Sequence, residues 1–288
     1  MARVHETHMQ GPVRQALKRL RSNRAAMIAA CLLFLEVALA LAAPSIAPHD
    51  PVAIDPQAPL SAPSLAHVMG TDQFGRDIFS RVLYGARISL QVGVISVSIA
   101  TVLGVPLGLF AGYYGGRVDS IISRAMDLML AFPEILLALG IITILGPSLR
   151  NSMMAVGISA IPSRVRLVRG SVLAARENVY VEAAHALGCS QMSIMFRHIL
   201  PNVVSPLIVL TTLSLASSIL AAASLSYLGL GAQPPTPEWG AMLGSGRNLM
   251  GVAWWMTTFP GLGIILTVLT MNMLGDGLRD ALDPKLGA

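Results

Sequence analysis

Charged residues are scarce in this chain. Only 12% of its 288 residues are Asp, Glu, Lys or Arg, whereas an ordinary soluble domain is about one quarter charged. Hydrophobic residues make up 54% of the sequence. A soluble fold of this composition would have too few charged side chains to cover its surface. We therefore expect an all-α integral membrane protein.

Cysteine, lysine and histidine are also sparse. The two cysteines lie far apart, so no disulfide framework is expected. Neither lysine, Lys18 or Lys285, stands in the P-loop pattern G-x-x-x-x-G-K-[ST] that binds nucleotide phosphates. Among six histidines only His5 and His8 approach metal-ligand spacing, and no nucleophile elbow or zinc-protease helix is present. We predict no catalytic residue, no metal and no cofactor bound by this chain.

Six apolar runs approach the length of about 20 residues that a membrane-spanning helix needs. The predicted spans are 25–43, 88–112, 121–145, 152–168, 203–223 and 257–276. The fourth is the weakest, because Pro162 and Arg164 interrupt it. We interpret the first as a retained anchor helix rather than a cleaved signal peptide, since 24 residues precede it.

Basic residues give the expected orientation. They form no stripe interleaved with aromatic residues, which argues against nucleic acid as a partner. With the N-terminus in the cytoplasm, 15 of the 20 Lys and Arg residues lie on inner segments, as the positive-inside rule requires. Both termini are therefore expected to be cytoplasmic. The predicted order is a cytoplasmic segment 1–24, the anchor helix 25–43, an extracytoplasmic loop 44–87, a membrane core 88–277 with a cytoplasmic loop 170–202, and a cytoplasmic tail 278–288.

Residues 180–202, YVEAAHALGCSQMSIMFRHILPN, interrupt the apolar pattern. Tyr180 begins a helical face that ends before Gly188, where glycine permits left-handed backbone geometry. Ser190 suits the N-cap of a second helix, and Pro201 predicts that this helix stops or bends. The apolar face of the second helix is predicted to contain Met192, Met195, Phe196 and Ile199.

Two interpretations of this second helix remain. An adaptable Met/Phe face suits a groove on a partner protein, whereas an amphipathic helix can also rest on lipid headgroups. Helices on lipid surfaces are usually rich in Lys and Arg, and this one carries a single firm positive charge, Arg197. The pattern therefore favours docking on a partner over lipid contact.

The same stretch resembles the EAA motif of binding-protein-dependent ABC transporter permeases, which reads EAA, three residues, G, nine residues, I, one residue, LP. Only the isoleucine departs: His198 takes its place and Ile199 follows. In that family the loop fits a cleft on the ATPase subunit, so the resemblance implies a coupling role here. The implied coupling residues are Glu182, Ala183, Ala184, Gly188, Met192, Met195, Phe196, Leu200 and Pro201.

Further segments resemble the dipeptide/oligopeptide/nickel permeases of the DppC/OppC type. They are GTDQFGRDIFSRVLYGARISL (70–90), FPEILLAL (132–139), LVRGSVLAARENVYVEAA (167–184) and SYLGLGAQPPTPEWGAML (226–243). The resemblance implies a type I ABC importer permease fold, with six transmembrane helices arranged as an anchor helix plus a five-helix core in the bacterial cytoplasmic membrane. It implies three kinds of partner besides lipid: a DppB/OppB-like second permease, two ABC ATPase subunits carrying ATP and Mg, and an extracytoplasmic solute-binding protein.

The implied function is ATP-driven import of di- or oligopeptides, with nickel chelates or glutathione as alternative substrates. A self-powered secondary transporter is an alternative of another class, and it should show paired carboxylates or histidines at mid-membrane. A membrane scaffold without transport activity is a third, but it has no reason to carry charges inside its spans.

Charged residues supply two further candidate sets. Ionisable groups within spans mark transport pathways by default, which makes Glu134 and Asp127, and more weakly Glu36, candidate pathway residues. A cluster of alternating sign precedes the second span; it either pairs locally or contacts a docking binding protein. The cluster consists of Asp72, Arg76, Asp77 and Arg81.

Overall fold

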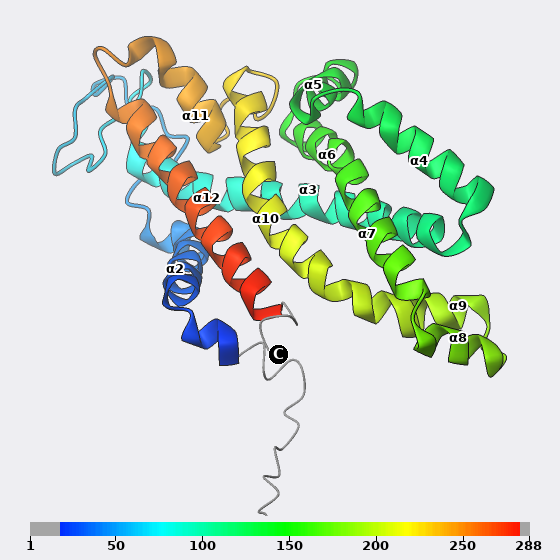
Figure 1. Ribbon diagram of the computed structural model, residues 1–288. Helices are drawn as coiled ribbons and strands as arrows, with labels where there is room; N and C mark the ends of the chain where they lie inside the picture. Colours follow the sequence, from blue (N-terminus) through cyan, green and yellow to red (C-terminus); the bar gives the residue numbers. More distant parts are fainter. Residues whose placement is uncertain (1–17, 283–288) are drawn as a thin grey trace, which may run out of the picture.

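The computed structural model describes residues 18–282, and within them the chain is helical, with a single isolated β-bridge and no strand (Figure 1). The elements are α2 (Arg24–Ile46), α3 (Ile78–Tyr114), α4 (Gly116–Leu130), α5 (Glu134–Leu145), α6 (Leu149–Ser159), α7 (Ile161–Arg176), α8 (Val179–Ala186), α9 (Gln191–Ser193), a π-helical stretch (Ile194–Ile199), α10 (Leu200–Tyr227), α11 (Trp239–Gly246), a 3₁₀ turn (Arg247–Leu249) and α12 (Trp255–Leu282). His5, His8 and most of the predicted terminal segments lie outside the described residues.

Four helical segments of the described chain are long and apolar enough to cross a membrane: α2, α3, Gln191–Tyr227 and α12. They contain the predicted spans 25–43, 88–112, 203–223 and 257–276. Because α3 already begins at Ile78, the loop between α2 and α3 covers residues 47–77, and it is shorter than the predicted loop 44–87.

The other two predicted spans differ from expectation. Residues 121–145 are no single helix, since α4 and α5 meet at a bend of 90° and count as a fifth span only together. Pro133 lies in this break, where its ring and missing N–H oppose a continuous helix. The run 152–168 consists of parts of α6 and α7, which meet at Ala160. The fold contains several spans, and the number six stays a prediction.

Close packing of α3 on α7 forms the centre of the helical core. Three glycines of α3, Gly104, Gly108 and Gly112, recur every four residues and face α7. A Cβ atom at Gly108 would lie 2.7 Å from the Cβ of Val168, and the other two glycines are equally close to side chains one turn away on α7. Small residues at this spacing let two backbones approach closely within a membrane.

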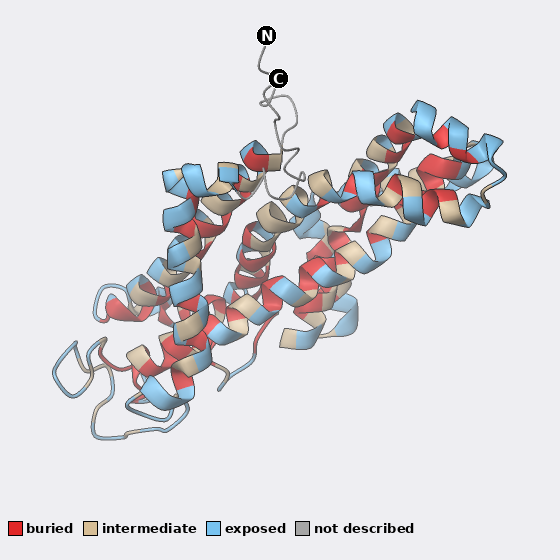
Figure 2. Ribbon diagram, turned by 90° about the horizontal axis from the view of Figure 1, so that it is seen from below, coloured by how far each residue is buried: buried red, intermediate tan, exposed pale blue. Residues whose placement is uncertain are grey.

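The anchor helix α2 packs against α12. Its buried positions are mostly alanines, and Glu36 among them accepts a hydrogen bond from the hydroxyl of Thr267. The opposite side of α2 exposes large apolar residues such as Phe34 and Leu41. Figure 2 shows the general pattern, in which buried residues gather where helices meet and exposed residues cover the outer faces. Apolar outer faces are what a helix bundle in lipid requires.

Candidate functional site

Residues 177–201, which we call the coupling segment, form a helical hairpin at the far ends of α7 and α10 (Figure 1). Asn178 closes α7 by donating its side-chain amide to two of the last carbonyls of that helix. Gly188 has φ of +75°, and the hydroxyl of Ser190 accepts a hydrogen bond from the N–H of Ser193 at 3.3 Å. The predicted glycine turn and serine cap are therefore both present.

The stop predicted as one outcome at Pro201 does not occur. The chain remains helical from Gln191 to Tyr227, and the six residues before α10 widen into the π-helical stretch Ile194–Ile199. Proline has no N–H to donate to the preceding turn, and a widened turn is one way for a helix to accommodate this. The side-chain amide of Asn202 donates to the carbonyl of His198 at 2.7 Å.

The inner face of the coupling segment packs on the ends of α3 and α7. Val181 and Ala184 of α8 join Ile194, Met195 and Ile199 in this buried cluster. Their partners are side chains of α3, α7 and α10: Leu109, Tyr113, Val168, Val172, Ala175, Val203 and Leu207. The hairpin is thus attached to the helical core by apolar contacts on one whole side.

This packing divides the predicted Met/Phe face. Met195 and Ile199 are fully buried, whereas Met192 and Phe196 are exposed. The prediction assumed 3.6 residues per turn throughout, and the π-helical stretch breaks that period. Met195 and Ala184 therefore belong to the interior of this chain and not to a contact surface for a partner.

The outer face of the hairpin carries Glu182, Ala183, Gly188, Leu187 and Met192, all exposed. Val179, at the start of α8, is exposed as well. Sequence reasoning missed Val179; the signal was its place out of phase with the buried Val181 and Ala184. Apolar side chains gathered on an exposed hairpin beside a carboxylate are typical of a protein contact surface.

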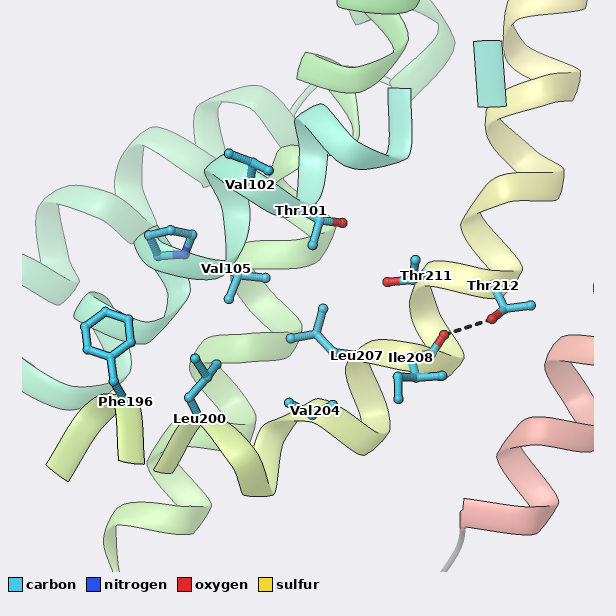
Figure 3. A pocket seen from close by; sticks show the side chains of 11 residues that line it. Thr101, Val102, Val105, Phe196, Leu200, Val204, Leu207, Ile208, Thr211 and Thr212 are labelled. Carbon is cyan, nitrogen blue, oxygen red and sulfur yellow. Dashed lines mark hydrogen bonds between the residues drawn. The ribbon is translucent and has the colours of Figure 1, made fainter. Parts of the chain in front are cut away.

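Phe196 and Leu200 line a groove between α3 and α10 (Figure 3). The groove has a volume of about 570 Å³. Its other lining residues are Thr101, Val102, Val105, Pro106, Val204, Leu207, Ile208, Thr211 and Thr212. Because the lining is mostly apolar, the groove offers few hydrogen-bonding groups to a polar substrate such as a peptide.

The candidate pathway residues Asp127 and Glu134 have different partners. Asp127 of α4 pairs with Arg166 of α7 at 3.0 Å, and both side chains are about two-thirds exposed. A second pair, Asp119 with Arg169, also joins α4 to α7, through two contacts of 2.5 and 2.7 Å. Asp127 therefore takes part in one of two ion pairs between α4 and α7. An exposed ion pair such as Asp127 with Arg166 contributes little stability.

Glu134 is the first residue of α5, directly after the proline break, and it is exposed. Arg164 of α7 interacts with it electrostatically. Arg164 is itself buried and donates to the hydroxyls of Thr101 at 3.2 Å and Ser214 at 2.8 Å. Sequence reasoning treated Arg164 only as an interruption of a span, although a buried arginine within a membrane helix is a signal of function.

The charged cluster before α3 is internal. One carboxylate oxygen of Asp72 forms an ion pair with Nε of Arg76 at 2.6 Å and lies 3.8 Å from Nε of Arg81, and all three residues are buried. Asp77, also buried, caps α3 by accepting from the N–H of Ser80 at 2.8 Å. The expectation that these four residues contact a docking protein is corrected, because buried side chains form no docking surface. The alternative, a locally paired loop, describes them.

Arg81 extends this cluster to a distant part of the chain. Its guanidinium donates to the carbonyls of Pro51 at 2.7 Å and Pro235 at 3.3 Å. Nearby, Glu238 is buried at the N-cap of α11, where its carboxylate accepts the N–H groups of Gly240 and Ala241 at 3.0 and 2.9 Å. Burial raises the pKa of Glu238, and the backbone hydrogen bonds oppose this only in part.

Residues 104–288 match the binding-protein-dependent transport system inner membrane component. The chain belongs to this family. Residues 11–63 also match the N-terminal TM domain of oligopeptide transport permease C. The predicted ABC permease family is therefore confirmed. The prediction of a multi-pass protein of the inner membrane is confirmed as well. Membership identifies a transport component, not an enzyme, and decides against a self-powered secondary transporter.

Curated relatives cover nearly the whole permease chain. It is 49% identical to the dipeptide transport system permease protein DppC of Alkalihalophilus pseudofirmus, over 96% of this chain and 90% of that protein. It is 46% identical to the glutathione transport system permease protein GsiD of Pectobacterium atrosepticum, over 98% and 94%. It is 45% identical to the di/tripeptide transport system permease protein DppC of Pseudomonas aeruginosa, over 96% and 93%.

A solved structure shares the permease fold. The MetNI methionine ABC transporter in an inward-facing conformation superposes with a TM-score of 0.56 at 22% identity, covering 72% of this chain and 98% of that chain. At this identity the likeness shows the fold alone. The predicted type I ABC importer permease fold is confirmed in this sense.

Proposed function

We propose that this permease imports small peptides, di- or oligopeptides, in an ATP-driven complex. The complex would contain a DppB/OppB-like second permease, two ABC ATPase subunits that bind ATP and Mg, and an extracytoplasmic solute-binding protein. The names of relatives at 45–49% identity support peptide transport. Glutathione, itself a tripeptide, is an alternative supported by a relative at 46%, and nickel chelates remain an alternative from the subfamily resemblance.

The observation that carries the proposal is the two-sided coupling segment. Its outer face presents Glu182, Ala183 and Gly188 to a partner, while its inner face is buried against α3 and α7. Ala183 and Gly188 allow close approach of the ATPase backbone, and the carboxylate of Glu182 fixes the register by meeting a basic or hydrogen-bonding group. A displacement imposed on the outer face then reaches the core helices through the buried face.

This arrangement suits alternating access. When the ATPases close on ATP, they move the coupling segment, and the attached helices rock between inward- and outward-facing states. The closely packed α3–α7 pair would move as one body, because its glycine contacts leave no room for sliding. Leu200 and Pro201 connect the hairpin directly to α10 in the same motion.

Orientation follows the same proposal. In Figure 1 the start of α2, the end of α12 and the hairpin of α8 and α9 lie toward the lower side, opposite α11. If the hairpin faces the ATPases, both ends of the described chain lie on the cytoplasmic side. The basic-residue distribution supports the same orientation.

For the substrate path we propose Glu134 together with Arg164. Glu134 is exposed at a proline break, where irregular backbone commonly lines a cavity. Arg164 supplies a positive charge near it from α7. The exposed carboxylate of Glu134 would meet the amino end of a peptide, whereas the buried Arg164 acts on that carboxylate electrostatically. Asp127 is the weaker member of the predicted pair, because Arg166 already occupies its carboxylate.

The experiment compares three versions of the tagged chain purified from membranes: wild type, a Glu182→Arg, Gly188→Pro double variant, and Glu177→Arg as control. Glu177 is exposed in the same segment but outside the motif, so its variant reproduces the charge change alone. We expect wild type and the control to bring down an ATP-hydrolysing subunit and the double variant to lose it while staying membrane-inserted. Wild type that purifies alone and without ATPase activity would overturn the proposal.

The substrate is tested separately in the reconstituted complex. ATP hydrolysis is measured with the solute-binding protein loaded with a dipeptide, with an oligopeptide, with glutathione or with a nickel chelate. We expect the peptides to stimulate hydrolysis most. Stimulation by glutathione or nickel chelate alone would leave the coupling mechanism intact and replace the proposed substrate.

A further inference from the structure

The loop between α2 and α3 brings together three potential metal ligands from distant positions. His49 follows the end of α2, His67 lies later in the loop, and Asp77 is the N-cap of α3. Nδ1 of His67 lies 3.0 Å from one carboxylate oxygen of Asp77, and Nδ1 of His49 lies 3.8 Å from the other. The two imidazole rings are 4.8 Å apart between centroids.

The donor set matches a divalent transition metal. Two imidazoles and one carboxylate are ligands that zinc, nickel and cobalt accept. Ligand atoms of a tetrahedral site with bonds of about 2.1 Å lie roughly 3.4 Å apart, and the three candidate ligand atoms all lie within 4.8 Å of one another. The His49 side chain is 42% exposed and the His67 side chain 15%, so His49 can shift inward and water can fill the remaining position.

The surroundings already hold the carboxylate in place. The N–H and hydroxyl of Ser80 donate to one oxygen of Asp77 at 2.8 and 2.7 Å. The same hydroxyl accepts the backbone N–H of His49 at 3.2 Å, so a single serine orients one ligand and the backbone of another. Outer contacts of this kind orient the ligands of metal sites in proteins.

Charge balance distinguishes Asp77 from its neighbour Asp72. Both carboxylates are buried, but Asp72 is paired with two arginines, Arg76 and Arg81. Among the described residues, the cation-forming groups within salt-bridge distance of Asp77 are the two imidazoles alone. A buried carboxylate needs a positive partner, and a metal ion held by both imidazoles would supply one.

We propose that His49, His67 and Asp77 bind one divalent transition-metal ion, which joins the end of α2 to the start of α3. On binding, the hydrogen bond between Nδ1 of His67 and Asp77 is replaced by two bonds to the metal. The imidazole binds as the neutral tautomer with its proton on Nε2, and a protonated ring releases one proton.

The probe is Zn²⁺ alone, titrated against a chromophoric chelator into the full chain in lipid nanodiscs, purified without a polyhistidine tag. We expect one equivalent of Zn²⁺ per chain. His49→Ala and His67→Asn should each weaken binding at least about 10-fold; asparagine keeps a donor for Asp77 and so protects the cap of α3. Co²⁺ in the same site should give the visible absorption of a low-coordinate ion.

Two control variants locate the site. His5→Ala, His8→Ala changes the other pair with ligand spacing, and His185→Ala removes an exposed histidine of α8; both should bind as wild type does. Melting temperatures give a second readout of binding. Zn²⁺ should raise the Tm of wild type and of both controls but not of His49→Ala. Absence of Zn²⁺ binding, binding unchanged in His49→Ala and His67→Asn, or binding lost in a control overturns the proposal, and in the first case the two imidazoles serve Asp77 by hydrogen bonding and charge.

Discussion

At the residue scale, two methionines three positions apart have opposite surroundings. Met195 has 0% of its surface exposed, whereas Met192 is 54% exposed on the outer face of the coupling segment. We expect Met195→Ala to destabilise the chain by about 2–5 kcal/mol, because it leaves a cavity in the buried cluster. Met192→Ala should change stability by less than about 0.5 kcal/mol but reduce recovery of the ATPase subunit. Melting temperature and co-purified ATPase activity measure the two effects.

Each methionine serves as the control for the other, since the substitution is the same. Equal loss of melting temperature in both variants would contradict the division of this helix into an inner and an outer face. Full ATPase recovery with Met192→Ala would remove that residue from the contact surface.

Glu238 gives a second prediction at this scale. Because burial raises its pKa above the ordinary value of 4.5, the unfolded chain releases this proton at lower pH than the folded chain does. Stability from this group is therefore complete below pH 4.5 and is lost as pH rises toward the folded-state pKa. We expect the Tm of wild type to fall over this range and the fall to be smaller in Glu238→Gln. Parallel pH profiles of the two proteins would show that Glu238 does not titrate there.

In the candidate site, the local backbone features could be predicted from the sequence, whereas the burial of individual side chains could not. Gly188 and Ser190 act through their own conformational freedom and hydrogen bonding, so the turn and cap could be predicted. The burial of Met195 depends on the π-helical stretch and on α3 and α7, which are distant in sequence. Asp72 shows both cases: its partners Arg76 and Arg81 are close in sequence, whereas Met242 of α11 and Met256 of α12, which lie beside it, are distant in sequence.

At the element scale, the packing of α3 on α7 depends on glycine. A Cβ at Gly108 would lie 2.7 Å from Val168 and 2.8 Å from the carbonyl of Val165. We expect Gly108→Ala to lower stability by about 1–3 kcal/mol through overpacking. Gly140→Ala in α5 is the matched control, because a Cβ there meets nothing within 4 Å and alanine favours the helix by about 1 kcal/mol. Thermal unfolding in detergent should thus show a lower Tm for Gly108→Ala only. A lower Tm for Gly140→Ala as well would point to a general intolerance of alanine.

Elements were predicted well where apolar runs were long and uninterrupted. The predicted spans 25–43 and 203–223 each lie within one helix. Pro133 divided 121–145 because the apolar pattern does not record backbone hydrogen bonding, and the turn at Ala160 divided 152–168 for a reason the apolar pattern does not contain. The early start of α3 at Ile78 reflects a cap by Asp77, a residue that sequence reasoning assigned to a charged cluster preceding the second span.

At the scale of the whole molecule, the proposed orientation places the loop 47–77 and the coupling segment on opposite sides of the membrane. Single cysteines can test this in a chain with Cys31 and Cys189 replaced. Leu65→Cys and Leu187→Cys suit the test, because both leucines are strongly exposed. A membrane-impermeant maleimide should label Leu65→Cys in intact spheroplasts and Leu187→Cys only after lysis. Labelling in the reverse order would invert the orientation, and equal labelling of both would exclude opposite sides.

The π-helical stretch Ile194–Ile199 has a consequence for insertions and deletions in this chain. Each residue of an α-helix turns the chain by about 100°, so deleting one residue here would rotate the hairpin of α8 and α9 by roughly that angle about the axis of α10. Every side chain would keep its chemistry, yet the carboxylate of Glu182 would face a new direction. The angular setting of the hairpin is therefore encoded by a residue count, and the exposed positions of this stretch, Phe196 and Arg197, should tolerate substitutions far better than the stretch tolerates insertions or deletions.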